Sequence, residues 1–201
     1  MEKKYSMIIT PSDEISSQIK QINKLVKRKG KKREYVPHIT LHSSILSSRT
    51  DFIDKARDWL REQNPFIFTL RKVSSFSRPG TVYLTSDDDS EIEEISNLYY
   101  GLESLLKDET VINENGDVFV PHLTLGSYHT SKKLIKAESR FTYLFEDSIQ
   151  FPILKVDVTE KVGVFRWKTI DSLMIGKNQF DNQQITPEIY RFGDNRRASV
   201  V

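Results

Sequence analysis

Two short stretches of the chain carry residues that can transfer protons and hold a phosphate. The first spans residues 36–41 (VPHITL) and the second spans residues 120–125 (VPHLTL), so they differ only by an Ile/Leu exchange. Both are apolar, rich in β-branched residues and alternating, which predicts strands. Side chains two positions apart on a strand point to the same face. Each predicted strand therefore presents one imidazole beside one hydroxyl: His38 with Thr40, and His122 with Thr124.

Two imidazoles that face one phosphate suit acid–base displacement at phosphorus. Because histidine titrates near pH 6.5, one ring can be neutral while the other is protonated. The neutral ring would take a proton from attacking water and the charged ring would give one to the departing oxygen. Each role contributes about 10²- to 10⁴-fold to the rate. The threonine hydroxyls would donate hydrogen bonds to the non-bridging phosphate oxygens and fix the orientation of the substrate.

A structural or metal-binding role for these histidines is the alternative. A single strand histidine is more often structural, but two of only four histidines occupy the same place in a repeated run, which favours a functional pair. Zinc could in principle use His38 with His42, or His122 with His129. Alternation places His38 and His42 on one face, yet Thr40 lies between them and neither run contains Asp or Glu. We therefore predict a site without metal, with His42 and His129 at the surface or at the edge of a groove.

The order of predicted elements is also repeated. Each half reads strand, helix, motif strand, helix, strand, and the motif strand is the second strand of its half. The spacing agrees, because Phe66 follows His38 by 28 positions and Phe151 follows His122 by 29. The predicted elements are strand 5–10, helix 13–29, strand 35–43, helix 48–61 and strand 66–73, then strand 81–85, helix 89–106, strand 120–125, helix 131–143 and strand 152–158. Turns are predicted at 77–80, 113–117 and 161–163, and a last strand covers 164–175.

Two His-x-Thr motifs on apolar strands, one in each half of a chain of this size, resemble the two-histidine phosphoesterase superfamily. Its members include RNA 2',3'-cyclic phosphodiesterases (often called 2',5' RNA ligases), plant and yeast cyclic phosphodiesterases, and viral 2',5'-phosphodiesterases. The resemblance covers residues 1–176. It implies an α+β fold of two pseudo-symmetric β-α-β-α-β halves, with lobes at about 1–80 and 81–176 around a central cleft. Residues 177–201 are polar and are predicted to be an appendage.

The resemblance also implies roles for the motif residues. His38 would be the proton donor and His122 the proton acceptor in hydrolysis, with Thr40 and Thr124 binding the phosphate. Candidate substrate contacts are Arg78, in a turn where the family often places a basic or aromatic residue, and Phe76 and Tyr128, which could stack on a base or pack at an edge. The implied enzyme is a phosphoric diester hydrolase, with 2',5' ligation as the reverse reaction.

Several substrates fit this chemistry. The first is a 2',3'-cyclic phosphate or a 2',5' diester in RNA or a nucleotide. ADP-ribose 1'',2''-cyclic phosphate and a cyclic oligonucleotide signal are alternatives within the same chemistry. A non-catalytic RNA-binding module on the same fold is an alternative of another class, but a binding module has no need for two facing imidazoles.

Composition narrows the remaining possibilities. The chain has 201 residues, of which 37% are hydrophobic and 29% charged, as in an ordinary globular protein. It has no cysteine, which excludes disulfides, thiol nucleophiles and thiolate metal sites. The net charge of +2 is too small to give the strong positive field that would favour binding of long nucleic-acid duplexes. The basic run 27–33 has two interpretations, a solvated helix end or a phosphate-binding rim beside the site. We expect a cytoplasmic monomer without cofactor, membrane span or signal peptide, acting on an RNA end or a small cyclic nucleotide.

Overall fold

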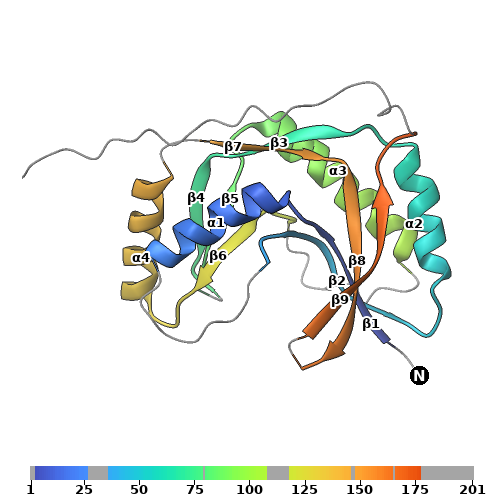
Figure 1. Ribbon diagram of the computed structural model, residues 1–201, viewed down its shortest axis with the longest axis horizontal. Coiled ribbons are helices and arrows are strands. Elements are labelled where there is room, and N and C mark those ends of the chain that lie inside the picture. Colours follow the sequence, from blue (N-terminus) through green and yellow to red (C-terminus); the bar gives the residue numbers. More distant parts are fainter. Residues whose placement is uncertain are drawn as a thin grey trace, which may run out of the picture.

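The structure is a computed structural model that describes residues 3–26, 36–78, 80–107, 118–145, 148–164 and 166–177. Its described part contains a seven-stranded antiparallel sheet, a two-stranded antiparallel sheet and four helices (Figure 1). The predicted α+β class is therefore confirmed. The elements are β1 (Lys3–Ile9), α1 (Asp13–Val26), β2 (Ile39–Ser47), α2 (Asp51–Arg61), β3 (Phe66–Leu70), β4 (Lys72–Phe76), β5 (Thr81–Thr85), α3 (Asp89–Leu106), β6 (Leu123–Ser127), α4 (Ser131–Leu144), β7 (Ile149–Ile153), β8 (Lys155–Gly163) and β9 (Arg166–Met174).

The two halves of the chain exchange strands. The large sheet has the order β4-β5-β6-β2-β1-β8-β9, so β5 of the second half pairs with β4 of the first. In the same way β1 of the first half pairs with β8 of the second. The small sheet joins β3 to β7, again one strand from each half. The two predicted lobes therefore share strands across the boundary that the sequence placed near residue 80.

An approximate twofold axis relates the halves. Ile39 pairs with Leu123 in the large sheet, and Phe68 pairs with Phe151 in the small sheet. Each pair joins residues at equivalent positions of the two halves, so Phe151 corresponds to Phe68, and the sequence spacing that aligned it with Phe66 was wrong by two residues. When equivalent residues face each other across an antiparallel pair, the axis passes between them, so it runs through the β2–β6 contact and the β3–β7 contact.

Each half has one more strand than the sequence predicted. The predicted strand 66–73 is divided at Arg71, where the chain leaves the small sheet and enters the large one as β4. Leu154 divides β7 from β8 in the same way. The turn predicted at 161–163 is wrong, because β8 continues through Gly163. The predictions for 27–33, 113–117 and 178–201 concern residues outside the described ranges.

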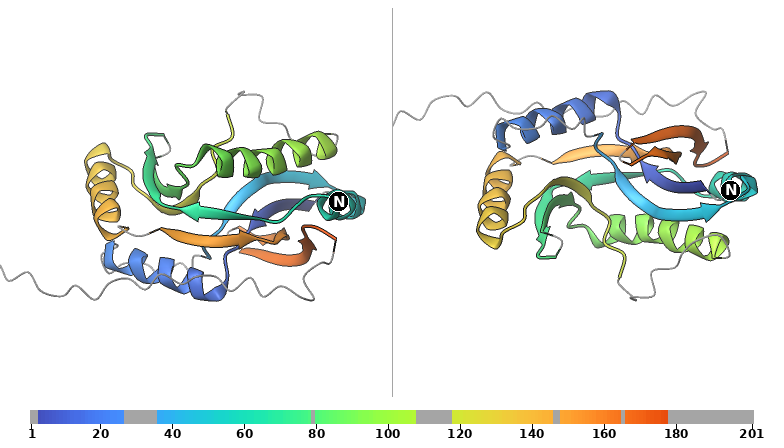
Figure 2. Two further views of the ribbon diagram at one scale, coloured as in Figure 1. Left: turned by 90° about the horizontal axis from the view of Figure 1, so that it is seen from above. Right: turned by 90° about the horizontal axis from the view of Figure 1, so that it is seen from below.

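The hydrophobic core lies between the large sheet and the helices. Isoleucines and a valine at helical spacing in α1 are buried. The isoleucine and leucine residues of both motifs, Ile39, Leu41, Leu123 and Leu125, are at most 3% exposed, whereas the motif valines Val36 and Val120 are exposed. Burying each such side chain contributes about 1.5–3 kcal/mol. Figure 2 shows α1 and α3 on opposite sides of the strands, and Figure 1 shows α4 and α2 at opposite ends of the molecule.

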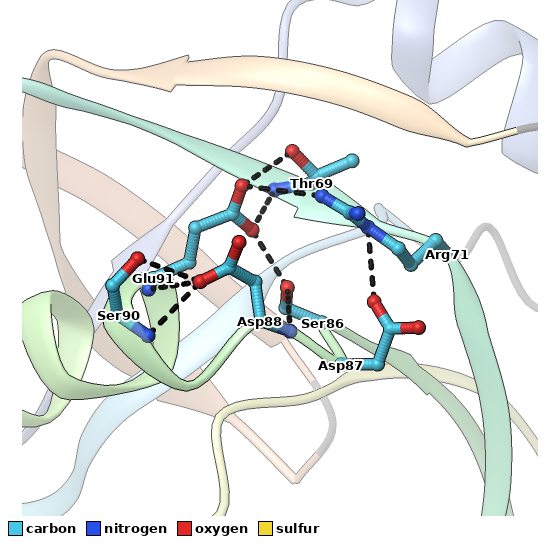
Figure 3. A network of polar contacts seen from close by, with 7 residues as sticks. All are labelled: Thr69, Arg71, Ser86, Asp87, Asp88, Ser90 and Glu91. Carbon is cyan, nitrogen blue, oxygen red and sulfur yellow. Dashed lines mark hydrogen bonds and ion pairs between the residues drawn. The ribbon is translucent and has the colours of Figure 1, made fainter.

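A polar network joins β3 and β5 to the start of α3 (Figure 3). The Glu91 carboxylate accepts hydrogen bonds from the Thr69 amide at 2.8 Å, the Thr69 hydroxyl at 2.7 Å and the Ser86 hydroxyl at 2.6 Å. Asp88 caps α3 by accepting from the amides of Ser90 and Glu91. Thr69 and Ser86 are each 1% exposed, so this carboxylate is what satisfies their buried donors.

Within the residues that the structure describes, no helix has the length and apolar character needed to span a bilayer.

Candidate active site

The two motif strands lie side by side near the middle of the large sheet. β2 and β6 are neighbours, and Ile39 pairs with Leu123. Extending this register by one residue each way sets Thr40 opposite His122 and His38 opposite Thr124. Side chains directly opposite in an antiparallel pair have Cβ atoms about 4.5–5.5 Å apart, and diagonal neighbours are about 7–8 Å apart. The two imidazoles are such diagonal neighbours, so both can reach a single phosphate.

Both histidines are oriented by the same backbone contact. Nδ1 of His38 lies 2.7 Å from the carbonyl oxygen of Val36, and Nδ1 of His122 lies 2.8 Å from that of Val120. A carbonyl oxygen can only accept, so Nδ1 carries the proton and donates in both rings. Proton transfer is then left to Nε2 of each imidazole. β2 and β6 each begin one residue after the histidine. The sequence predicted that both strands begin before the histidine. The difference arises because the contact between the imidazole and the carbonyl two residues earlier is turn-like and precedes each strand.

The surroundings of His122 favour its neutral form. Burial lowers the pKa of His122 below its usual value near 6.5. The hydrogen bond to the Val120 carbonyl raises this pKa, and positive charge on His38 lowers it further. The lowered pKa favours the form of His122 whose Nε2 is unprotonated near neutral pH.

A β-bulge follows the threonine in each motif. On β2, Thr40 pairs with Ile8 and His42 pairs with Met7, so Leu41 is the extra residue. On β6, Thr124 pairs with Tyr83 and Gly126 pairs with Val82, so Leu125 is the extra residue. Bulges bend a strand and re-aim its side chains, and they are common beside active sites. The repeat therefore includes backbone geometry as well as residue types.

The first bulge turns His42 away from His38. His42 pairs with Met7, on the core side of the sheet, and is 7% exposed. Its Nε2 donates to the backbone oxygen of Tyr99 at 3.0 Å, and its ring stacks on that of Tyr99 with centroids 4.6 Å apart. The prediction that His42 lies at the surface, on the face of His38, was wrong because the bulge changes the alternation. His42 is a structural residue beneath α3.

His42 predicts a pH dependence of stability. Burial lowers its pKa below the unfolded value of about 6.5, although the Tyr99 hydrogen bond and the charge of Glu103 oppose this shift. Below pH 6.5 the unfolded chain then binds more protons at this position than the folded chain, so stability falls as the pH falls. Replacing His42 with Gln should make the fall in urea-unfolding free energy between about pH 7.5 and pH 5.5 shallower. An unchanged slope would contradict the assignment.

Two aromatic rings contact His122. Phe76 lies edge-on to the imidazole with centroids 5.1 Å apart, and Tyr83 does so at 5.3 Å. The two aromatic rings stack on each other at 4.3 Å. Phe76 was predicted near the site and is found there. Tyr83 was missed, because only the register that sets it opposite Thr124 brings it to His122.

Comparison with known proteins shows the family of this chain. Residues 11–163 match the model of the 2'-5' RNA ligase superfamily, which is more than half of the chain. The chain belongs to the 2'-5' RNA ligase superfamily. This membership confirms the assignment to the two-histidine phosphoesterases and supports an enzyme that acts on phosphoester bonds. No curated protein sequence matches the chain.

Solved structures of superfamily proteins share the fold at low sequence identity. Escherichia coli LigT complexed with 3'-AMP aligns with a TM-score of 0.63 at 15% identity, covering 88% of this chain and 100% of LigT. A structure described as a phosphoesterase aligns with a TM-score of 0.63 at 13% identity, covering 88% of this chain and 100% of its own. These likenesses establish the fold, while the motif residues come from this chain itself.

The other predicted contacts of this superfamily member are Arg78, in the turn between β4 and β5, and Tyr128, which follows β6 and contacts that turn. Arg78 is exposed in the turn, two residues after Phe76. Tyr128 is half-buried against the core, and its hydroxyl is buried without a hydrogen-bond partner among the described residues. Its amide donates to the oxygen of Gly80, which has a φ of 82°. Stacking by Tyr128 on a base stays a prediction, and His129 is exposed as expected.

Thr85 also helps to position the candidate active site, and the sequence analysis did not identify it. Its hydroxyl donates to the carbonyl oxygen of Pro121 at 2.7 Å, and its own carbonyl oxygen accepts from the Arg71 amide at 3.1 Å. Pro121 immediately precedes His122, so this buried contact fixes the backbone that carries the imidazole. Among the described residues, no group of three or more His, Asp or Glu side chains is arranged to hold a metal ion.

Proposed function

We propose that this superfamily member is a metal-independent phosphodiesterase that hydrolyses a 2',3'-cyclic phosphate or a 2',5' phosphodiester in RNA or a nucleotide. The observation that carries the proposal is the pairing of Ile39 with Leu123, because extending this register by one residue sets each threonine opposite the histidine of the other motif. This pairing offers two Nε2 atoms and two hydroxyls to one phosphate. A module that only bound RNA would have no use for two symmetrically oriented imidazoles.

The steps of hydrolysis balance without a cofactor. Nε2 of neutral His122 takes a proton from water as the water oxygen forms a bond to phosphorus. The bond from phosphorus to the ribose oxygen breaks, and Nε2–H of protonated His38 gives its proton to that oxygen. The hydroxyls of Thr40 and Thr124 donate to the non-bridging oxygens, whose charge grows in the transition state. In the reverse reaction, ligation, the two histidines exchange roles.

The assignment of His122 as the base is supported by its surroundings. Burial lowers its pKa, and a base must be unprotonated to accept a proton. Charge on His38 lowers this pKa as well, so protonation of the acid helps to keep the base neutral. These surroundings suit His122 as the base, and the family resemblance implies His38 as the acid.

The rings beside His122 provide a surface for the base or ribose of the substrate. Phe76 and Tyr83 both contact the imidazole, so a nucleoside attached to the bound phosphate can reach them. Stacking of a base on an aromatic ring is worth about 1–3 kcal/mol. A nucleotide substrate also agrees with the LigT structures that this chain resembles, which hold 3'-AMP, NADP+ or ATP.

A turnover assay tests the proposal directly. Purified protein should hydrolyse a nucleoside 2',3'-cyclic phosphate to a monophosphate, and the rate should be unchanged by EDTA because the imidazoles supply all the acid–base chemistry. Mass spectrometry of a panel with 2',5'-oligoadenylate, RNA ends and ADP-ribose 1'',2''-cyclic phosphate would identify the substrate. Loss of activity in EDTA that a divalent ion restores would refute the metal-free mechanism.

The threonines should matter less than the histidines. Replacing Thr40 or Thr124 with Ala removes one hydrogen bond to a charged oxygen, worth about 1.5–3 kcal/mol. We therefore expect kcat/KM to fall by about 10- to 150-fold. Replacement by Ser keeps the hydroxyl and should restore most of the rate. A serine variant as slow as the alanine variant would show that the methyl group, and not the hydroxyl, is required.

A further inference from the structure

The β8–β9 hairpin exposes apolar and basic side chains together. Within residues 161–170 the described apolar side chains are 37–78% exposed, although apolar residues in a strand are normally half-buried. They are Val162, Val164, Trp167 and Ile170. Trp167 is 44% exposed, which is high for a residue type that is largely buried on average. Exposed apolar side chains gathered in this way mark a binding surface.

The segment 161–170 of this hairpin carries positive charge. It includes Lys161, Arg166 and Lys168 and contains no Asp or Glu. In the described part of the chain, none of these three cations is within ion-pair distance of an acid, although Glu160 lies opposite Lys168 in the strand pairing. Glu160 lies 3.0 Å from Lys3, and Asp171 lies 2.6 Å from Arg57. The expected ligand is therefore an anion with apolar faces.

The strand register places this surface on the same side of the sheet as the motifs. Thr40 pairs with Ile8, and Ile8 pairs with Asp157. Lys161 follows Asp157 by four positions on β8, so it points to the same face. Trp167 pairs with Lys161 across the hairpin and shares that face.

The distance suits a ligand longer than one nucleotide. β9 is three strands from β2, which is about 14 Å at the usual strand spacing of about 4.8 Å. Four residues along β8 add about 13 Å in the strand direction at about 3.3 Å per residue. Trp167 is therefore roughly 20 Å from Thr40 across the sheet. A single nucleotide bound at the motifs does not extend so far, whereas single-stranded sites cover about 4–16 nucleotides.

We propose that the β8–β9 hairpin binds the single-stranded RNA that continues from the reacting phosphodiester, with Trp167 stacking on a base and Lys161 contacting a phosphate. Arg166 and Lys168 are the neighbours of Trp167 on β9 and therefore point to the opposite face. The inference rests on the proposed function and names an RNA strand of several nucleotides as the substrate. An aromatic ring beside a cation is the combination that single-stranded nucleic acids require, because every base has a π-face and every linkage a charge. Figure 1 shows the hairpin extending to the lower edge of the molecule.

The binding test uses an RNA that the enzyme cannot turn over. A ten-nucleotide oligouridine with a 3'-phosphate, labelled at its 5' end, is titrated with the full chain and followed by fluorescence anisotropy. Replacing Trp167 with Ala should weaken binding by about 5- to 100-fold, the effect of losing one base stack. Replacing it with Phe should keep affinity within about threefold. Unlabelled RNA should quench the tryptophan fluorescence of the wild type, and the Phe variant should lose this quenching.

The basic residue of this face is tested through salt. Wild-type affinity should fall as salt rises from about 50 to 200 mM, and replacing Lys161 with Ala should reduce the slope of log K against log salt by about 0.7 for the one phosphate that is no longer neutralised. The matched control replaces Lys132 with Ala, which removes the same charge from α4 at the far end of the molecule (Figure 1). Equal effects of the two variants would overturn the proposal in favour of general electrostatic attraction.

Kinetics separate this proposal from the proposed function. Replacing Trp167 with Ala should leave hydrolysis of a mononucleoside 2',3'-cyclic phosphate within about twofold, while kcat/KM for a ten-nucleotide RNA with the same end should fall by about 5- to 100-fold. If the wild type turns over neither substrate, the proposed function fails and the binding assays still decide the role of the hairpin. RNA affinity that does not change in the Trp167→Ala variant, as expected if the hairpin docks an acidic protein, would overturn the proposal.

Discussion

Replacing His38 or His122 with Ala is expected to lower turnover of a nucleoside 2',3'-cyclic phosphate by at least about 10²-fold, because each replacement removes one proton-transfer group. The double variant should be little worse than the slower single variant. Groups that act in one concerted step are not additive, since losing either one already removes the step. Initial rates at saturating substrate, compared across the four proteins, measure this directly.

The same pair predicts a bell-shaped dependence of rate on pH. Activity needs one proton on two rings, so the rate rises as the base loses its proton and falls as the acid loses its own. Because burial lowers the pKa of His122, the rising limb should lie below about pH 6.5. Both apparent pKa values belong to the coupled pair. Each single alanine variant should lose the bell shape.

The control for these variants is His129→Ala, since His129 is exposed. It should retain wild-type activity and folding. His42 is unsuitable as a surface control, because its ring is buried against Tyr99 and its replacement affects stability. Normal activity in His122→Ala would show that the second motif is structural and that the chemistry does not use the pair.

Replacing Glu91 with Ala should destabilise the fold by about 3–5 kcal/mol. Three short hydrogen bonds to this carboxylate would be lost, and hydrogen bonds to charged groups are worth about 1.5–3 kcal/mol each without being additive. The buried donors of Thr69 and Ser86 would then have no acceptor, and that cost dominates. Urea unfolding followed by circular dichroism measures the change as a shift of the midpoint.

Two variants calibrate the effect of Glu91. Glu91→Gln keeps one side-chain oxygen and should cost about 1–2 kcal/mol. Glu94→Ala, at an exposed position of the same helix, should stay within about 0.5 kcal/mol of the wild type. Activity measured at a temperature where Glu91→Ala is still folded should also fall, because β5 carries Thr85, which holds the Pro121 carbonyl. A loss of stability no greater than that of Glu94→Ala would disprove the role of the network.

The motifs, the approximate bounds of the helices and strands, and the fold class could all be predicted from the amino-acid sequence. The alternation of VPHITL and VPHLTL was enough to place each histidine and its threonine on one face, because this follows from local strand geometry alone. Helical spacing located α1, α2, α3 and α4 for the same reason. The repeat also implied two related halves, and the superfamily assignment followed from it.

The features that depend on strand pairing could not be predicted from the sequence. Strand partners and register come from contacts between segments far apart in the chain, and no local pattern records that β4 joins β5 while β8 joins β1. The bulges at Leu41 and Leu125 likewise exist only relative to a partner strand. The bulge at Leu41 turned His42 into the core against prediction, and the register brought Tyr83 to His122 unforeseen. Local alternation therefore held for each histidine and its threonine, whereas pairing between strands decided the face of His42 and the contacts of His122.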